Sequence, residues 1–102
     1  MKMIEAIICP VYMDEVEAAL KKMGVEQIGV EEIMISRLVN GVGKKLFYRG
    51  AEYVNDFMER LKIEIIAADE VVGKIVETIG KIAQTEGKWD CRICVLPIVN
   101  AF

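Results

Sequence analysis

Histidine is absent from this chain of 102 residues. Its absence removes the side chain that most often acts as a general acid or base and that most often ligates metals. The sequence also offers no pair of carboxylates on one predicted face and no nucleophile beside a base. We therefore expect a protein that is not an enzyme, and we expect no metal site within one chain.

Cysteines are few and odd in number. Cys9, Cys91 and Cys94 fit free thiols in a reducing compartment better than a disulfide framework. Cys91 and Cys94 have C-x-x-C spacing, but positions i and i+3 of a strand point to opposite faces. Neither a second pair nor a histidine completes a zinc site. Structural thiols are the preferred interpretation, and a metal- or redox-responsive module using these cysteines is the alternative.

Long apolar runs and excess positive charge are also missing. No apolar run approaches the ~18 residues that a membrane helix needs, and Glu5 interrupts the apolar start where a signal peptide would continue. We expect a cytoplasmic protein that does not span a membrane.

The chain has 13 Lys and Arg against 16 Asp and Glu, a net charge of −3. Nucleic acid is therefore not an expected partner, because phosphate binding needs a basic stripe.

Apolar residues are abundant instead. They make up 54% of the chain, whereas about 45–50% is usual for soluble domains. The length fits a single domain over residues 1–102. The excess of apolar residues predicts surface that becomes buried in an oligomer.

The apolar pattern predicts the element order βαββαβ. Helices are expected to follow Asp14 and Asp69, each predicted as an N-cap, and Gly24 is expected to end the first helix. Strands are predicted over four segments: 2–9, 27–35, 61–67 and 92–99.

This order predicts the ferredoxin-like α+β fold, in which two βαβ halves form a four-stranded antiparallel sheet with two helices on one face. Two helices cover only one face of such a sheet. The other face still carries apolar side chains, which favour burial. We therefore expect a homo-oligomer in which sheet faces pack together.

Residues 46–57 read Leu-Phe-Tyr-Arg-Gly-Ala-Glu-Tyr-Val-Asn-Asp-Phe. Their mixed pattern fits neither a helix nor a paired strand, so a long loop is expected over about 37–55. Compact domains rarely carry a loop near 20 residues unless it has a function, usually binding.

Part of this segment, Tyr48-Arg-Gly-Ala-Glu-Tyr53, resembles the T-loop of the PII signal-transduction family, the nitrogen regulatory protein P-II family. The opening Met-Lys-x-Ile-Glu-Ala-Ile-Ile-x-Pro, Lys62-Ile-Glu-Ile65 and Ala83-Gln-Thr85 are similar to other parts of that family. The resemblance covers nearly the whole chain. It implies a homotrimer with a barrel-like core of sheets, protruding T-loops, and nucleotide sites in the clefts between subunits.

The resemblance also implies a small anionic effector, with ATP, ADP or AMP as the candidate nucleotides. Arg60 stands where the family has a lysine that grips 2-oxoglutarate, and Arg92 stands where it has a phosphate-binding lysine. An anion pocket is one interpretation of these charges, and ordinary surface ion pairing is the other. The residues expected at the nucleotide site are Arg37, Arg60, Gly87, Lys88 and Arg92.

The sequence departs from the family at several ligand-binding positions. In the phosphate-binding turn, Trp89 and Cys91 replace glycines. At the base of the T-loop, Ile35, Arg37 and Val39 replace two glycines and a glutamine. The residues after the last predicted strand, Asn-Ala-Phe, do not resemble the family's basic tail. These departures predict altered nucleotide binding and argue against 2-oxoglutarate as an effector.

The T-loop is expected to contact a partner protein, a transporter or a metabolic enzyme. Tyr53 matches a tyrosine that some family members have uridylylated, but partner contact is preferred because tyrosine is enriched in binding hot spots. Arg49 is expected to contact the partner too, with a solvated loop charge as the alternative. The resemblance thus implies a regulator whose T-loop responds to the effector.

Overall fold

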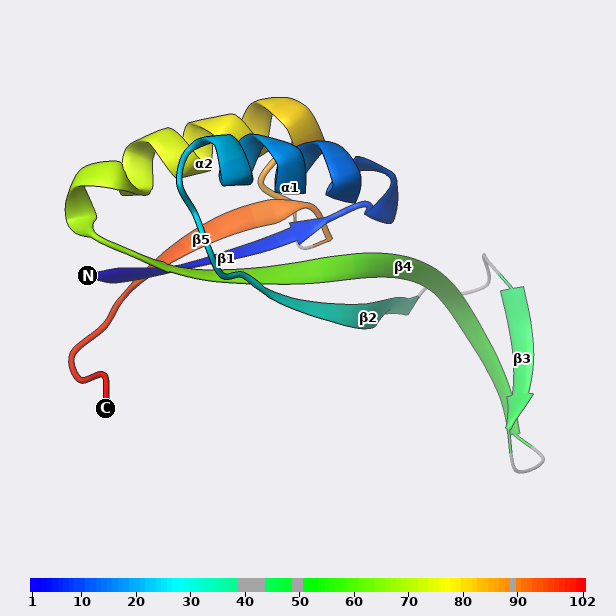
Figure 1. Ribbon diagram of the computed structural model, residues 1–102. Coiled ribbons are helices and arrows are strands. Elements are labelled where there is room, and N and C mark those ends of the chain that lie inside the picture. Colours follow the sequence, from blue (N-terminus) through cyan, green and yellow to red (C-terminus); the bar gives the residue numbers. More distant parts are fainter. Residues whose placement is uncertain (39–43, 49–50, 89) are drawn as a thin grey trace.

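A single antiparallel sheet lies against two helices (Figure 1). The computed structural model describes residues 1–38, 44–48, 51–88 and 90–102, and side chains within 1–36, 57–88 and 90–102. The strand order is β2-β4-β1-β5, with β3 paired to β4 beyond this path. In chain order the elements are β1 (Lys2–Ile8), the 3-10 turn η1 (Pro10–Tyr12), α1 (Met13–Lys22), β2 (Gly29–Leu38), β3 (Lys44–Tyr48), β4 (Ala51–Ala67), α2 (Asp69–Ala83) and β5 (Arg92–Pro97).

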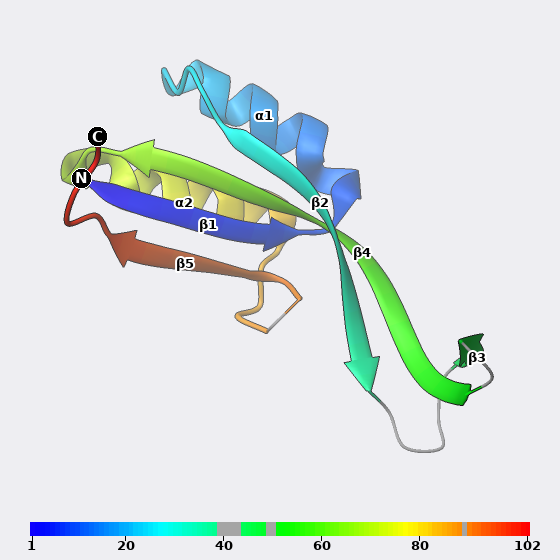
Figure 2. The ribbon, with the colours of Figure 1, turned by 90° about the horizontal axis from the view of Figure 1, so that it is seen from below.

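This arrangement confirms the predicted ferredoxin-like fold. Both helices lie on the same side of the sheet (Figure 1). The view from below shows the opposite face, which neither helix covers (Figure 2). We call this second face the bare face. The ends of the strands agree with the prediction to within three residues, except in β4, which begins ten residues before the expected 61.

The core lies between the helices and the sheet. Alternate residues of β1 and β4 point toward the helices, as the two-residue period of a strand requires. The helices supply apolar residues at intervals of three and four. The buried core consists of Ile4, Ala6, Ile8, Val16, Leu20, Ile63, Ile65, Ala67, Ile75, Ile79 and Ala83.

The helix starts differ from the predicted caps. Asp14 and Asp69 lie inside the first turns of their helices, and the N-cap positions are Tyr12 and Ala68, without a side-chain hydrogen bond. The backbone of η1 leads directly into α1, which places the start of this helix ahead of Asp14. Carboxylates in a first turn still favour the helix, because they lie near the positive end of its dipole. Gly24, with a φ of 87°, ends α1 as predicted.

The expectation that residues 46–57 form neither a helix nor a paired strand is wrong. β3 pairs with β4 from Lys44↔Asn55 to Tyr48↔Ala51. We call β3, with residues 51–58 of β4 and 35–38 of β2, the arm; it projects from the body of the fold (Figures 1 and 2). Backbone pairing in a ribbon away from the core needs no apolar alternation, so the pattern did not reveal it.

The bare face is mixed in character rather than uniformly apolar. One row across three strands is apolar and consists of Leu96, Met3 and Ile66, of which Ile66 is 57% exposed. The middle of the face carries charged side chains. Two ion pairs lie there: Lys62–Glu64 at 3.5 Å and Arg92–Glu5 at 3.7 Å.

Candidate functional site

Arg60 lies on β4 where this strand leaves the body of the fold for the arm, opposite Ile33 of β2. Its Nε donates a hydrogen bond to the backbone oxygen of Asp90 at 3.1 Å, and its Nη2 forms an ion pair with Asp90 Oδ2 at 3.1 Å. Its Nη1 donates to the backbone oxygen of Glu59 at 2.8 Å. The guanidinium therefore ties the base of the arm to a segment 30 residues further along the chain.

Asp90 belongs to the turn that connects α2 with β5. This turn begins at Gln84, whose φ of 52° and ψ of 46° place it in the left-handed region. The N–H groups of Glu86 and Gly87 both donate to the Cys91 carbonyl, at 3.2 and 3.1 Å. Gly87 has a φ of 77°, which glycine adopts without strain. We call residues 84–91 the α2–β5 turn.

The α2–β5 turn is the segment for which phosphate contacts are predicted. In this structure the N–H groups of Glu86 and Gly87 are used within the turn. Lys88 lies on the surface and pairs with Glu86 at 3.0 Å. An anion bound through the N–H groups of Glu86 and Gly87 would have to replace these internal hydrogen bonds, whereas the side-chain cations need no such exchange with the backbone.

Arg92 follows the α2–β5 turn at the start of β5 and lies on the bare face. Its Nη2 is 3.7 Å from Glu5 Oε1, and its Nη1 is 2.6 Å from Cys94 Sγ. Both Arg60 and Arg92 are thus engaged by acceptors of the same chain. The ion pairing expected as an alternative to an anion pocket is present in the structure.

The other predicted residues lie on the arm. The backbone of Arg37 pairs with Asp56, four residues further out along β4 than Arg60, and the backbone of Tyr53 pairs with Leu46. Their side chains, and all of Arg49, are outside the described residues. The structure therefore brings Arg60 together with the α2–β5 turn and places Arg37 and Tyr53 outward on the arm.

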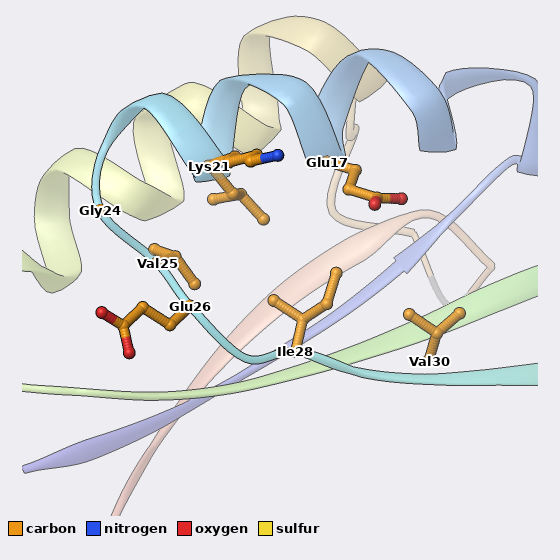
Figure 3. Close-up of a pocket in the computed structure, with 8 residues that line it drawn as sticks. Glu17, Lys21, Gly24, Val25, Glu26, Ile28 and Val30 are labelled. Atoms are coloured by element: carbon orange, nitrogen blue, oxygen red, sulfur yellow. The ribbon is translucent and has the colours of Figure 1, made fainter.

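Of two surface hollows, one includes a residue of the candidate site. One of about 430 Å³ lies at the base of the arm and is lined by Pro10, Glu32, Ile33, Met34, Glu59, Arg60 and Leu61. A second lies between α1 and the approach to β2, where Val25 and Ile28 face the helix residues Glu17 and Lys21 (Figure 3). The predicted site residues do not line the second hollow, so only the hollow at the base of the arm belongs to the candidate site.

Comparison with known proteins decides the family. The family model described as nitrogen regulatory protein P-II matches residues 1–102. The chain belongs to the nitrogen regulatory protein P-II family. A P-II protein of Cereibacter sphaeroides is 40% identical and one of Rhodobacter capsulatus 41% identical, each alignment covering 99% of this chain and 88% of the relative. Nitrogen regulatory protein P-II 1 of Escherichia coli is 39% identical over 98% of this chain and 88% of its own length.

Membership of the P-II family confirms the resemblance found in the sequence. The family is one of signal-transduction regulators, and the relatives are named as regulatory proteins, which agrees with the expectation of a protein that is not an enzyme. None of the helices in the described part of the chain combines the length and the apolar character needed to cross a bilayer.

The cysteines of this P-II family chain have different surroundings. Cys91 Sγ lies 3.9 Å from the backbone oxygens of Ala83 and Gln84, at the end of α2, whereas Cys94 Sγ lies beside the Arg92 guanidinium. Within the residues that the structure describes, no group of three or more Cys, Asp or Glu side chains is placed to hold a metal ion. The metal- or redox-responsive alternative gains no support from this arrangement.

Asp90 is the site residue that sequence reasoning missed. Its contact with Arg60 joins residues 30 positions apart. The contact depends on where the α2–β5 turn lies relative to β4, which a local sequence pattern does not show. Glu5, the partner of Arg92, was missed for the same reason.

Proposed function

We propose that this chain, a single domain over residues 1–102, forms a homotrimer, binds a small anionic effector in clefts between subunits and regulates a partner protein through its arm. The effector is an adenine nucleotide: ATP, ADP or AMP. The partner is a transporter or a metabolic enzyme, and the protein acts in the cytoplasm. The observation that carries this proposal is that a P-II family chain has Arg60 and the α2–β5 turn together at the base of a projecting arm.

The bare face supports the trimer. Ile66 and Leu96 are 57% and 44% exposed, and both lie in the apolar row that crosses β5, β1 and β4. Burial of apolar surface is favourable by roughly 25 cal/mol per Å². Ion-paired side chains in the middle of the face can enter an interface because each charge keeps a partner.

The cations near the turn support an anionic effector. An arginine guanidinium presents donors in a fork that matches phosphate oxygens, and a lysine adds a mobile charge. Arg60, Arg92 and Lys88 supply these groups within or beside the α2–β5 turn. We do not propose 2-oxoglutarate, because the residues at the base of the arm depart from the family's pattern for that ligand.

The position of the site supports regulation through the arm. A ligand shifts a conformational equilibrium only when it binds one conformer more tightly than the other. An effector that contacts Arg60 acts on β4, the strand that continues into the arm. Changes in the arm would reach a partner through Tyr53 and Arg49, the residues proposed for partner contact or modification.

Calorimetric titration with ATP, ADP and AMP, together with light scattering of the same sample, tests the proposal. We expect the mass of a trimer and one nucleotide per subunit. Arg60→Gln should weaken nucleotide binding by about 10-fold or more, because a hydrogen bond to a charged group contributes roughly 1.5–3 kcal/mol.

Lys22→Gln is the matched control, because it removes one exposed cation from the end of α1. This variant should bind nucleotide as the unchanged protein does. Absence of binding at millimolar nucleotide would rule out the nucleotide part of the proposal. Equal losses in both variants would show that overall charge, rather than Arg60, determines affinity.

A further inference from the structure

Arg60 has an acidic partner, Asp90, in the α2–β5 turn. Arg60 and Asp90 are 19% and 20% exposed, so their ion pair is partly removed from water. Charges in such a position interact more strongly than a pair on the open surface. The pair has two components, because Nε binds the Asp90 backbone oxygen and Nη2 binds its carboxylate.

This contact connects two elements that are otherwise far apart in sequence. Arg60 is on β4 at the base of the arm, and Asp90 is at the end of the α2–β5 turn. The same turn is held by hydrogen bonds to the Cys91 carbonyl, directly after Asp90. Movement of the turn away from β4 must therefore break the contacts of Arg60.

The backbone oxygen and the carboxylate of Asp90 together use two donors of Arg60 that an anionic ligand needs. Side-by-side N–H groups of a guanidinium bind carboxylate or phosphate oxygens in the same bidentate manner. Asp90 occupies the Nε and Nη2 donors of Arg60 in this structure. An external anion can use that pair of donors only after Asp90 has left them.

We propose that Asp90 is an internal occupant of the effector site, which holds Arg60 when no effector is bound and is displaced by the anionic effector. Displacement frees the α2–β5 turn from the base of the arm, and this coupling carries the regulatory signal. Competition from Asp90 thereby lowers the affinity of the site for the effector. The part that concerns the effector rests on the function proposed above, whereas the coupling of turn and arm rests on the observed contacts.

Nucleotide affinity of Asp90→Asn tests the competition. The amide keeps the shape of the side chain and removes its charge, so ATP should bind about 5- to 10-fold more tightly at fixed ionic strength, a change of about 1–1.4 kcal/mol. Arg60→Gln should bind weakly whether or not Asp90 is replaced. Unchanged or weaker ATP binding by Asp90→Asn would overturn the proposal.

Hydrogen exchange of the protein without ligand tests the coupling independently. Peptides from 57–62 and from 86–91 should both exchange faster in Asp90→Asn, which removes the charge of the ion pair, and in Arg60→Gln, which removes both contacts of the guanidinium with Asp90. The double variant should exchange no faster than Arg60→Gln, since Arg60→Gln already removes every contact of this guanidinium with Asp90. Additive effects, or an effect at only one of the two segments, would contradict the coupling.

Glu86→Gln is the matched control for this measurement. It removes a carboxylate from the same turn, but the ion pair it breaks with Lys88 is on the surface. Exchange in 57–62 should remain unchanged. If the protein binds no nucleotide while exchange follows the pattern above, the proposed effector class is wrong and the coupling of turn and arm stands. If nucleotide binds but the exchange pattern is absent, the proposed function stands and this inference fails.

Discussion

At the scale of single residues, Gln84 combines an unfavourable backbone with a structural task. It ends α2 with a φ of 52°, a region in which side chains with a Cβ atom are disfavoured by roughly 1–2 kcal/mol. Helices commonly end with glycine at such a position. The chain uses glutamine there and retains some local strain at the start of the α2–β5 turn.

We predict that Gln84→Gly stabilises the protein. The gain should be about 0.5–1 kcal/mol in the free energy of unfolding, because relief of strain exceeds the greater freedom of glycine in the unfolded chain. Urea unfolding at equal protein concentration measures it. Gln27→Gly, in an exposed loop with ordinary φ, should be neutral or destabilising, and a loss of stability in Gln84→Gly would contradict the assignment of strain.

The carboxyl of Glu77 has a pKa that is shifted by a neighbouring side chain. A hydrogen bond and the charge of Lys81, at 3.0 Å one helical turn away, lower the pKa of the Glu77 carboxyl below its usual 4.5. Since the pKa in the folded state is the lower one, the stabilisation is present above pH 4.5 and is lost as the pH falls through the folded-state value. NMR titration of Glu77 should show the lowered pKa, and Lys81→Gln should return it toward 4.5. A carboxyl that titrates identically in both proteins would exclude the ion pair.

At the scale of elements, α2 is fixed by its buried stripe. Ile75, Ile79 and Ala83 are buried at intervals of four, the spacing that puts side chains on one face of a helix. The arm shows the opposite case, because its strands pair although their sequence lacks a strand pattern. A buried face requires apolar residues at regular intervals in the sequence, whereas backbone pairing outside the core does not.

We predict that Ile79→Ala destabilises the protein by about 2–5 kcal/mol, since the side chain is fully buried and its removal leaves a cavity. Denaturant unfolding followed by circular dichroism measures the change. Thr78→Ala, on the same helix and half-buried, should change stability by no more than about 0.5 kcal/mol. Alanine favours a helix at both positions, so a loss in Ile79→Ala no larger than that in Thr78→Ala would contradict the packing role of Ile79.

At the scale of the whole molecule, the bare face determines what the fold can do alone. Its apolar row of Leu96, Met3 and Ile66 is left open by the two helices, which both lie on the other side of the sheet (Figure 2). The arm extends the molecule to 51 Å along its longest axis. Association through the bare face would leave the arms available to a partner.

We predict that Ile66→Lys prevents assembly while preserving the fold. A charge in the apolar row would have no partner in a buried interface, which is strongly unfavourable. Light scattering should give the mass of one subunit, and circular dichroism should remain that of the unchanged protein. Val71→Lys is the control, because Val71 is 45% exposed but lies on α2, away from the bare face. A trimer that survives Ile66→Lys would remove the bare face as the interface.

The sequence by itself determined the βαββαβ order of the main elements, the apolar pattern that accompanies it, and the family. These features follow from the periodicity of apolar side chains and from a resemblance to the P-II family over nearly the whole chain, and both can be recognised in the sequence without the structure. Only the tertiary structure decided that Asp90 holds Arg60, that Glu5 lies beside Arg92, and that β3 pairs with the outer half of β4. The contacts of Arg60 and Arg92 join distant residues, and the pairing within the arm uses backbone groups that every sequence provides. The path of the chain in space, rather than any local pattern, therefore decides them.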